Sequence, residues 1–240
     1  MAQGEWADWG ESVAQANVKR GVSAGYPKPS GGGSFCYAFS SKVSEAGQAV
    51  AKYVDLSNFN PIASGKGCSV RGTLRRHSSA GHSVFLIALG QSVADIYSDE
   101  AYLLGVWDAE PGKIALRKGI IAEGIPEDDD QILASSNLLY EGGQYLHLRL
   151  DVIVNGNGDV VLNVLQNDLS AHNVDAPVWE NIEGMGDPLN DDPTFVDDVL
   201  GINSGSVPFI GGGYVGYGYT SSQIGRNAFV DHLEMLRQTA

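Results

Sequence analysis

The sequence predicts an all-β protein built as a two-sheet antiparallel sandwich, a jelly roll, with a short N-terminal helical arm. The prediction rests on short β-prone runs separated by turn residues, on 31 glycines in 240 residues, and on the lack of helix-length periodic segments between the runs. Strands that follow one another without intervening helices pair as antiparallel sheets, so βαβ units are not expected.

The clearest element is a hairpin, residues 144–168, with the sequence QYLHLRLDVIVNGNGDVVLNVLQND. Its aliphatic residues alternate with polar ones, and NGNGD supplies the positive φ values of a tight reversal. The other face carries Tyr145, His147 and Arg149, and it is either the solvent side of a sheet or a binding surface. The expected core positions are Leu146, Leu148, Leu150, Val152, Val160, Leu162 and Val164.

Further strands are expected on both sides of this hairpin. Before it they cover residues 35–40, 51–56, 68–76, 83–89, 101–107 and 113–119, and after it come VPFIGGGYVGYGYT and NAFVDHLEML. An acidic, irregular insert, residues 171–206, separates the two groups, and a short helix is expected around residues 193–200. We therefore expect one β-sandwich domain over residues 35–240 that contains this insert.

The first 34 residues are expected to form a separate arm and linker. Trp6, Trp9 and Val13 fall at i, i+3 and i+7, which gives one stripe of an amphipathic helix over residues 5–20. Residues 21–34 are rich in Gly, Pro and Ser, as linkers are. A short helix cannot bury two tryptophans by itself. It therefore either folds back on its own domain or anchors these three residues on a neighbouring subunit.

Composition excludes some partners. The net charge of −14, from 29 acidic and 15 basic residues, would repel a phosphate backbone, so nucleic acid is not expected as a partner. The N-terminus lacks the apolar segment of a signal peptide, and no stretch approaches the ~20 apolar residues of a membrane span. We expect a protein made in the cytoplasm. Cys36 and Cys68 are too few for a disulfide scaffold, and whether they pair is left open.

Three motifs, in chain order, carry a resemblance to a known family: YLHLRLDVIVNGNGDVVLNV, GGYVGYGYT and GRNAFVDHLEML. Together they resemble the concanavalin A-like lectin/glucanase sandwich, the laminin-G-like jelly roll, over roughly residues 35–237 in strand order. The resemblance implies two curved antiparallel sheets, and many members bind glycans or calcium on the concave face or the rim loops. Because these are packing motifs, they specify fold better than function.

The resemblance suggests residues for a sugar site; it carries over no calcium ligands, and the calcium candidates come from the acidic stretch alone. A sugar could stack and form hydrogen bonds on a concave platform made of Tyr145, His147, Arg149, Tyr214, Tyr217 and Tyr219. In the acidic stretch DPLNDDPTFVDD, the oxygen ligands available to calcium are Asp191, Asp192, Asp197 and Asp198. Calcium is left open, and no other cofactor is expected.

The candidate acids do not form a catalytic pattern. Glycosidases of the resembled fold place carboxylates as E-x-D-x-x-E on one strand, and this chain has no such pattern. Glu180, Glu183 and residues 127–130 lie in turn-rich segments. His77 and His82 lack metal-binding spacing, and no G-x-S-x-G motif is present. We therefore expect a protein that is not an enzyme.

The favoured function is a structural or attachment component of a larger assembly. A bacteriophage virion protein, such as a head decoration, fibre or tail accessory protein, fits the acidic composition, the few cysteines and the lack of a signal peptide. Its partners would be other subunits, including further copies of the chain. The alternative is a soluble lectin-like glycan-binding module, and a polysaccharide-degrading enzyme ranks third.

Overall fold

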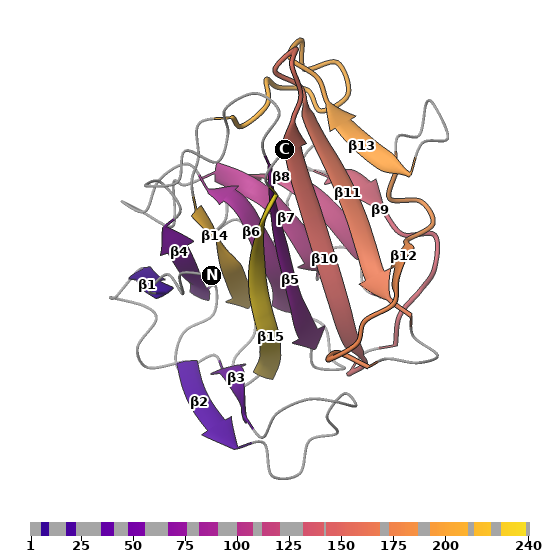
Figure 1. Ribbon diagram of the computed structural model, residues 1–240. Helices are drawn as coiled ribbons and strands as arrows, with labels where there is room; N and C mark the ends of the chain where they lie inside the picture. The colour runs from indigo at the N-terminus through magenta and orange to yellow at the C-terminus, as the bar shows by residue number, and fades with distance from the viewer. Residues whose placement is uncertain are drawn as a thin grey trace.

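The computed structural model is composed of β-strands arranged in two antiparallel sheets (Figure 1). It describes residues 6–9, 18–22, 35–40, 48–55, 67–75, 82–90, 100–107, 112–120, 132–141, 143–168, 173–186, 193–210, 214–221 and 227–238. Helices are absent from these residues, so none of them forms a helix long and apolar enough to cross a membrane. The predicted all-β, two-sheet antiparallel architecture is confirmed.

The sheet called sheet A here has seven strands in the order β1-β4-β14-β6-β7-β8-β9. Each strand pairs with its neighbours in antiparallel orientation. The strands are β1 (Trp6–Trp9), β4 (Gln48–Asp55), β6 (His82–Gly90), β7 (Glu100–Val106), β8 (Ile114–Ile120), β9 (Ile132–Ser135) and β14 (Tyr214–Ser221).

The second sheet, sheet B, has the order β12-β11-β10-β5-β15-β3-β2, and β13 also pairs with β11. In Figure 1 it lies in front of sheet A. Its strands are β2 (Val18–Val22), β3 (Phe35–Ser40), β5 (Gly67–Arg75), β10 (Tyr145–Val154), β11 (Val160–Asn167), β12 (Trp179–Asn181), β13 (Thr194–Asp197) and β15 (Asn227–Gln238). The last two strands insert centrally, β14 between β4 and β6 and β15 between β3 and β5.

The hairpin of β10 and β11 forms as the alternation predicts. Val152 lies opposite Leu162, and Leu150 lies opposite Val164. All seven predicted core residues are buried, and they pack in one cluster with inward-facing residues of sheet A such as Tyr102 and Leu104. Full burial of a Leu or Val side chain contributes about 1.5–3 kcal/mol, so this face alone is a large part of the driving force for folding.

The NGNGD turn closes this hairpin with its own side chains. The Asn155 side-chain oxygen accepts hydrogen bonds from the backbone N–H of Asn157 at 2.9 Å and of Asp159 at 3.0 Å. Gly158 has φ +90°, a conformation that L side chains rarely adopt. The oxygen-rich turn is therefore a hairpin turn whose Asn155 oxygen is already committed to backbone donors.

The glycine-rich strand β14 allows a close approach within sheet A. A Cβ atom on Gly218 would lie 2.4 Å from Cε2 of Phe85, so the ring of Phe85 occupies the space that a larger residue would need. Phe85 in turn stacks on Trp107, with ring centroids 4.7 Å apart. The glycine is required by packing against a neighbouring strand.

The predicted N-terminal helix is wrong where the structure describes it. Trp6–Trp9 forms β1, with Trp6 opposite Val54 of β4, and Val18–Val22 forms β2, with Val18 opposite Phe39 of β3. Isolated short helices are marginal, whereas an open sheet edge offers backbone partners to a Trp-rich, β-prone segment. Val13 and the side chains of Trp6 and Trp9 lie outside the described residues, so their role as an anchor stays a prediction.

The predicted helix around residues 193–200 is also wrong. Thr194–Asp197 forms β13, which pairs with β11 so that Phe195 lies opposite Leu162. Along β13 the side chains of Phe195 and Asp197 are buried, while Thr194 and Val196 are partly exposed. This period of two, together with the β-branched and aromatic residues, favours a strand.

Candidate functional site

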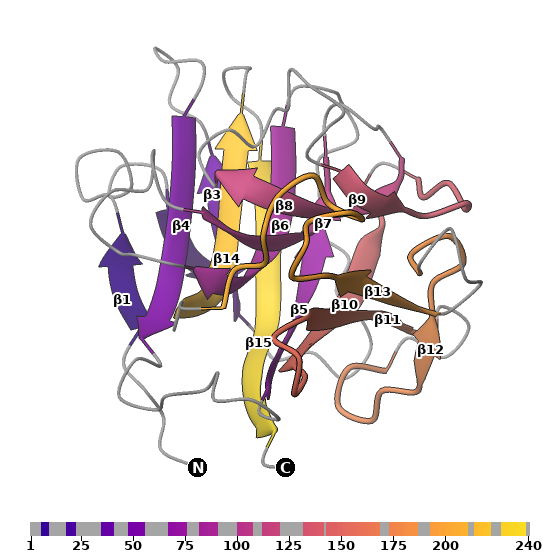
Figure 2. The ribbon, with the colours of Figure 1, turned by 90° about the horizontal axis from the view of Figure 1, so that it is seen from above.

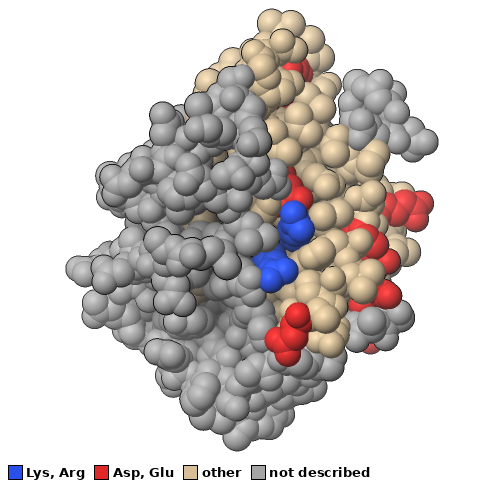
Figure 3. Space-filling model, viewed as in Figure 1, with Lys and Arg blue, Asp and Glu red and all other residues tan. Residues whose placement is uncertain are grey.

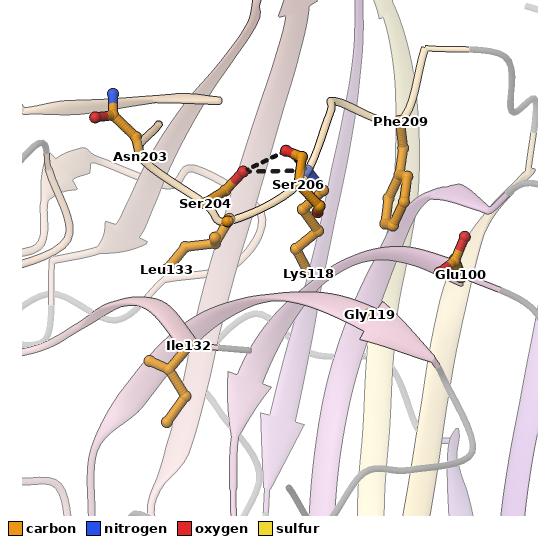
Figure 4. Close-up of a pocket in the computed structure, with 10 residues that line it drawn as sticks. Glu100, Lys118, Gly119, Ile132, Leu133, Asn203, Ser204, Ser206 and Phe209 are labelled. Atoms are coloured by element: carbon orange, nitrogen blue, oxygen red, sulfur yellow. Dashed lines mark hydrogen bonds between the residues drawn. The ribbon is translucent and has the colours of Figure 1, made fainter. Parts of the chain in front are cut away.

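A cavity of about 520 Å³ lies where residues 203–209 approach the edge of sheet A (Figure 4). Figure 4 shows Phe209 and Glu100 on one side of it, Ile132 and Leu133 on the other, and Lys118 between them. Its volume falls within the ~300–1,000 Å³ typical of ligand pockets, and it combines an aromatic ring with a few polar groups. It is therefore the candidate functional site.

One wall of the cavity is the rim loop, residues 198–210, which the buried ammonium group of Lys118 holds in place. Its Nζ lies 2.8 Å from Oδ2 of Asp197 and donates to Oγ of Ser204 at 3.2 Å. It also donates to the carbonyl oxygens of Ser206 at 2.8 Å and Val207 at 2.7 Å. Figure 2 shows this loop passing from β13 toward the strands of sheet A. Lys118 thus ties the loop to sheet A.

Asp197 joins the two sheets at this point. It accepts hydrogen bonds from Tyr102 of β7 and, at 2.5 Å, from Oγ of Ser204. The Tyr102 hydroxyl also accepts a hydrogen bond from the backbone N–H of Phe209 at 3.1 Å. Burial, and then the negative charge of Asp197, raise the pKa of Tyr102 above its ordinary value, so the phenol stays neutral. The backbone position of Phe209 is therefore set from the interior of the sandwich.

The rim loop also holds itself in shape. The carboxylate of Asp198 accepts hydrogen bonds from the backbone N–H groups of Leu200 at 2.9 Å, Ile202 at 3.3 Å and Asn203 at 3.0 Å. These donors, the Asn203 N–H foremost, lower the pKa of Asp198. The Asn203 side chain donates to the carbonyl oxygen of Val196 at 3.0 Å. The wall of the cavity is thus a hydrogen-bonded turn.

The acidic residues considered for calcium have other partners here. Asp197 is the counter-ion of Lys118, and Asp198 caps the rim loop, so these two carboxylates do not converge on one point. Within the described residues no group of three or more His, Cys, Asp or Glu is arranged to hold a metal ion. Asp191 and Asp192 lie outside the described residues, and calcium binding there stays a prediction.

The polar face of β10 is less open to solvent than an ordinary outer face. His147 is only 1% exposed, while Tyr145 and Arg149 are partly exposed. The ring of His147 lies 5.0 Å from the ring of Trp179 on the edge strand β12. The three predicted residues do share one face, and Trp179 covers part of it.

Basic residues gather on this same face of sheet B. Figure 3, which views the molecule from the side of sheet B, shows blue atoms near the middle of the visible surface. Arg71 lies directly opposite Arg149, and their guanidinium carbons lie 5.9 and 5.8 Å from the Trp179 ring centroid. Arg149 also pairs with Asp151 at 2.7 Å. This face carries charged groups that are packed on an aromatic ring.

The tyrosines of β14 do not join this face. Tyr217 and Tyr219 are each 1% exposed and belong to the core between the sheets, whereas Tyr145 lies on the outer face of sheet B. The side chain of Tyr214 lies outside the described residues. Alternation decides this separation: Tyr217, Tyr219 and Val215 point inward together because every second residue of a strand faces the same side.

Four residues of the site and its surroundings were not predicted: Lys118, Phe209, Glu100 and Trp179. A signal existed for Lys118, because Ile114, Leu116 and Lys118 share the inward face of β8 and a charge at the end of an apolar row requires a buried partner. The position of Phe209 depends on long-range contacts with Tyr102, so no local pattern could have identified it.

Comparisons with known proteins give similar folds only. No protein-family model matches the sequence, and no curated protein matches it. A Bacillus subtilis protein of unknown function with a galectin-like fold is similar at 11% identity, over 96% of this chain and 88% of that chain, with a TM-score of 0.46.

Two other solved structures are similar in the same way. The Emp47p carbohydrate recognition domain is 12% identical over 100% of this chain and 99% of that chain, with a TM-score of 0.48. A carbohydrate esterase from the Shiga toxin-encoding bacteriophage phi24B is 10% identical over 100% and 92%, also with a TM-score of 0.48. Likenesses this remote carry no conclusion about what this chain binds.

Proposed function

We propose that this chain is a glycan-binding module without catalytic activity and that the cavity beside the rim loop is its binding site. The observation that supports the proposal most directly is the position of Phe209, an aromatic side chain that lines a cavity together with hydroxyl and carboxylate groups. Sugars have an apolar face of C–H groups that packs on an aromatic ring, and hydroxyls that need polar partners around the edge.

The polar groups of the cavity suit hydroxyl recognition. Ser204 and Ser206 line it from the rim loop, and Glu100 lines it from β7. A carboxylate accepts hydrogen bonds from hydroxyls, and the Ser206 hydroxyl can both donate and accept, whereas the Ser204 hydroxyl already donates to Asp197 and can only accept. The wall is fixed by Lys118 and Asp198 before any ligand arrives, which lowers the entropic cost of binding.

The absence of catalysis is part of the proposal. Glycoside hydrolysis generally needs two carboxyl groups, about 5–5.5 Å apart in retaining enzymes. Glu100 is the single acid among the described residues that line the cavity. Incubating the protein with the glycans it binds, followed by chromatography of the products, should show no cleavage above background. Turnover that is lost in Glu100→Gln would contradict this part of the proposal.

Replacing Phe209 tests the binding site. A glycan array followed by calorimetric titration should identify a sugar, and Phe209→Leu should weaken its binding at least about ten-fold because the flat ring is lost while most of the apolar volume is kept. Leu139→Ala is the control, since Leu139 is an exposed apolar residue that does not line the cavity. Equal affinities in wild type and Phe209→Leu would reject the cavity as the site.

A second candidate function, an assembly component, is supported by the outer surface of the rim loop. The stretch VLGINSGSVPFI, residues 199–210, contains no charged residue in a chain of net charge −14. Exposed apolar side chains that gather on one surface are typical of interaction sites. The exposed side chains here are Val199, Leu200, Ile202, Val207 and Ile210.

A second copy of the chain is the partner proposed for this surface. Two acidic copies repel each other least where no charge is present, so self-association through residues 199–210 is favoured over other contacts. Light scattering should then show a dimer or larger species that dissociates in Leu200→Ser with Ile202→Ser. Leu139→Ser, also at a well-exposed leucine, is the matched control. A wild-type protein that stays monomeric at high concentration would reject self-association.

A further inference from the structure

The NGNGD turn contains both Asn-Gly pairs of the sequence, Asn155-Gly156 and Asn157-Gly158. An asparagine followed by glycine is chemically labile, because glycine has no side chain to hinder attack of its backbone nitrogen on the asparagine side chain. The two pairs have the same covalent structure and lie in the same turn. Any difference in their reactivity therefore comes from the fold.

The side chain of Asn155 is held at both of its ends. Its Oδ1 accepts hydrogen bonds from the backbone N–H groups of Asn157 at 2.9 Å and Asp159 at 3.0 Å. Its Nδ2 donates to Oδ2 of Asp159 at 2.9 Å. To react, Cγ of Asn155 must turn toward the backbone nitrogen of Gly156, which breaks these three hydrogen bonds. The turn therefore protects Asn155.

The side chain of Asn157 is exposed at the tip of the turn. Its backbone N–H binds Asn155, but its side-chain amide makes no hydrogen bond within the part of the chain that the structure describes. One contact opposes the reaction, because the N–H of Gly158 donates to the carbonyl oxygen of Asn155 at 3.1 Å. A single hydrogen bond must break before Asn157 reacts, against three at Asn155.

We propose that Asn157 is a site of spontaneous deamidation in the folded protein and that Asn155 is protected from the same reaction. The backbone nitrogen of Gly158 gives up its proton to hydroxide and attacks Cγ of Asn157. A C–N bond forms, the Cγ–Nδ2 bond breaks, and ammonia leaves with a proton taken from water. Water then opens the cyclic imide at either carbonyl, which leaves aspartate or isoaspartate. The net reaction consumes one water and releases one ammonia, so no oxidant or other reactant is needed.

The modification adds a negative charge next to the rim loop. Oδ1 of Asp159 accepts a hydrogen bond from the backbone N–H of Val199 at 3.0 Å, and a Cβ atom on Gly158 would lie 3.3 Å from Cγ1 of Val199. The tip of the β10–β11 hairpin thus packs on the start of the rim loop. Aspartate and isoaspartate are both ionised at neutral pH, and isoaspartate also lengthens the backbone of the turn by one methylene. The charge at this point therefore increases with the age of the protein.

Ageing of the intact protein tests the proposal. Wild-type protein is incubated in mildly alkaline buffer, folded in one sample and unfolded by urea in another, until the unfolded sample has reacted. Mass spectrometry of peptide fragments then locates the aspartate and isoaspartate that form. In the folded sample Asn157 should react at least about ten-fold faster than Asn155, because two fewer hydrogen bonds must break. In urea the two sites should react at similar rates.

Isoelectric focusing of aged, folded variants gives a second measurement. Wild type should develop a more acidic band, and Asn157→Gln should not. Asn137→Gln, at an exposed asparagine that is followed by leucine, is the control and should age as wild type does. Equal rates at Asn155 and Asn157 in the folded protein would overturn the proposal. So would a folded sample in which Asn157 stays unchanged while both sites react in urea.

Discussion

Two ion pairs of nearly equal length occupy contrasting places in this protein. Lys118 and Asp197 meet at 2.8 Å inside the sandwich, with side chains 3% and 0% exposed. Arg149 and Asp151 meet at 2.7 Å on the outer face of sheet B, with side chains 22% and 9% exposed. The distances alone suggest that the two pairs contribute equally to stability. The surroundings determine how much stability is lost when one partner is removed.

Burial determines the difference. In the outer pair the Arg149 side chain is 22% exposed, so water partly solvates it when Asp151 is removed, and such a pair contributes little. The inner pair has no solvent to replace a partner, and removal of one member leaves a buried charge uncompensated. The inner pair also holds the rim loop through Ser204 and Ser206, so the shape of the candidate site depends on it.

The largest predicted effect is on the inner pair. Asp197→Ala should destabilise the fold by about 3–5 kcal/mol, because Lys118 is left charged and buried and Tyr102 loses its acceptor. Urea unfolding measures this. Asp151→Ala is the matched control and should cost clearly less, since Arg149 keeps access to water. Equal losses in the two variants would show that burial does not determine the contribution of these ion pairs.

A substitution in the apolar core shows how much stability is lost when no charged group is involved. Leu150 is completely buried between the sheets, so Leu150→Ala should cost about 2–5 kcal/mol through lost contacts and the cavity that remains. Unlike Asp197→Ala, it should leave the rim loop ordered, as hydrogen exchange of the backbone amides of residues 200–207 would show. A loss below ~0.5 kcal/mol would mean that β10 turns its other face to the core.

A pH-dependent effect of intermediate size is expected at Cys68. It is a free, buried thiol, and burial, with a smaller contribution from Asp151, raises its pKa from 9.0 to about 12. The unfolded chain loses this proton above pH 9 and the folded chain does not, so stability falls by about 1.4 kcal/mol per pH unit between pH 9 and pH 12. Unfolding of Cys68→Ala should show a flatter decline over this window, and identical slopes would argue against the shift.

The smallest effect is expected for the outer pair. A double-mutant cycle of Arg149→Gln and Asp151→Asn should give a coupling energy below about 1 kcal/mol, because the arginine is partly solvated. Salt should reduce this coupling further. A coupling of 3 kcal/mol or more would show that the outer face is as poorly solvated as the interior.

The parts of the structure that follow local periodicity could be predicted from the sequence. The β10–β11 hairpin formed as expected because its alternation, turn and burial all indicate the same register. Helices were predicted for the N-terminal segment and for β13, because a few apolar residues in a short segment fit a helix as well as a strand. The structure has strands there, since the N-terminal strand β1 pairs with β4 and β13 pairs with β11. Tertiary contacts thus override weak local preferences.

The candidate site depended on contacts between distant segments. Tyr145, His147 and Arg149 were correctly expected on one polar face, but the cavity lies elsewhere and joins β7, β8 and the rim loop. Lys118 meets Ser206 across 88 residues of sequence, a pairing that alternation along one strand cannot indicate. In the sequence, only Lys118, a charged residue in the apolar, inward-facing row of β8, indicated this region.

Glycan binding in the cavity beside the rim loop can be tested by titrating ¹⁵N-labelled protein with the sugar selected on the array and following the amide and indole signals of the protein. If the cavity is the site, we expect saturable shifts at Ser204, Ser206, Phe209 and Gly119, with the indole signal of Trp179 unchanged. Shifts confined to Trp179 and its neighbours on sheet B, with the signals of the cavity unmoved, would contradict it.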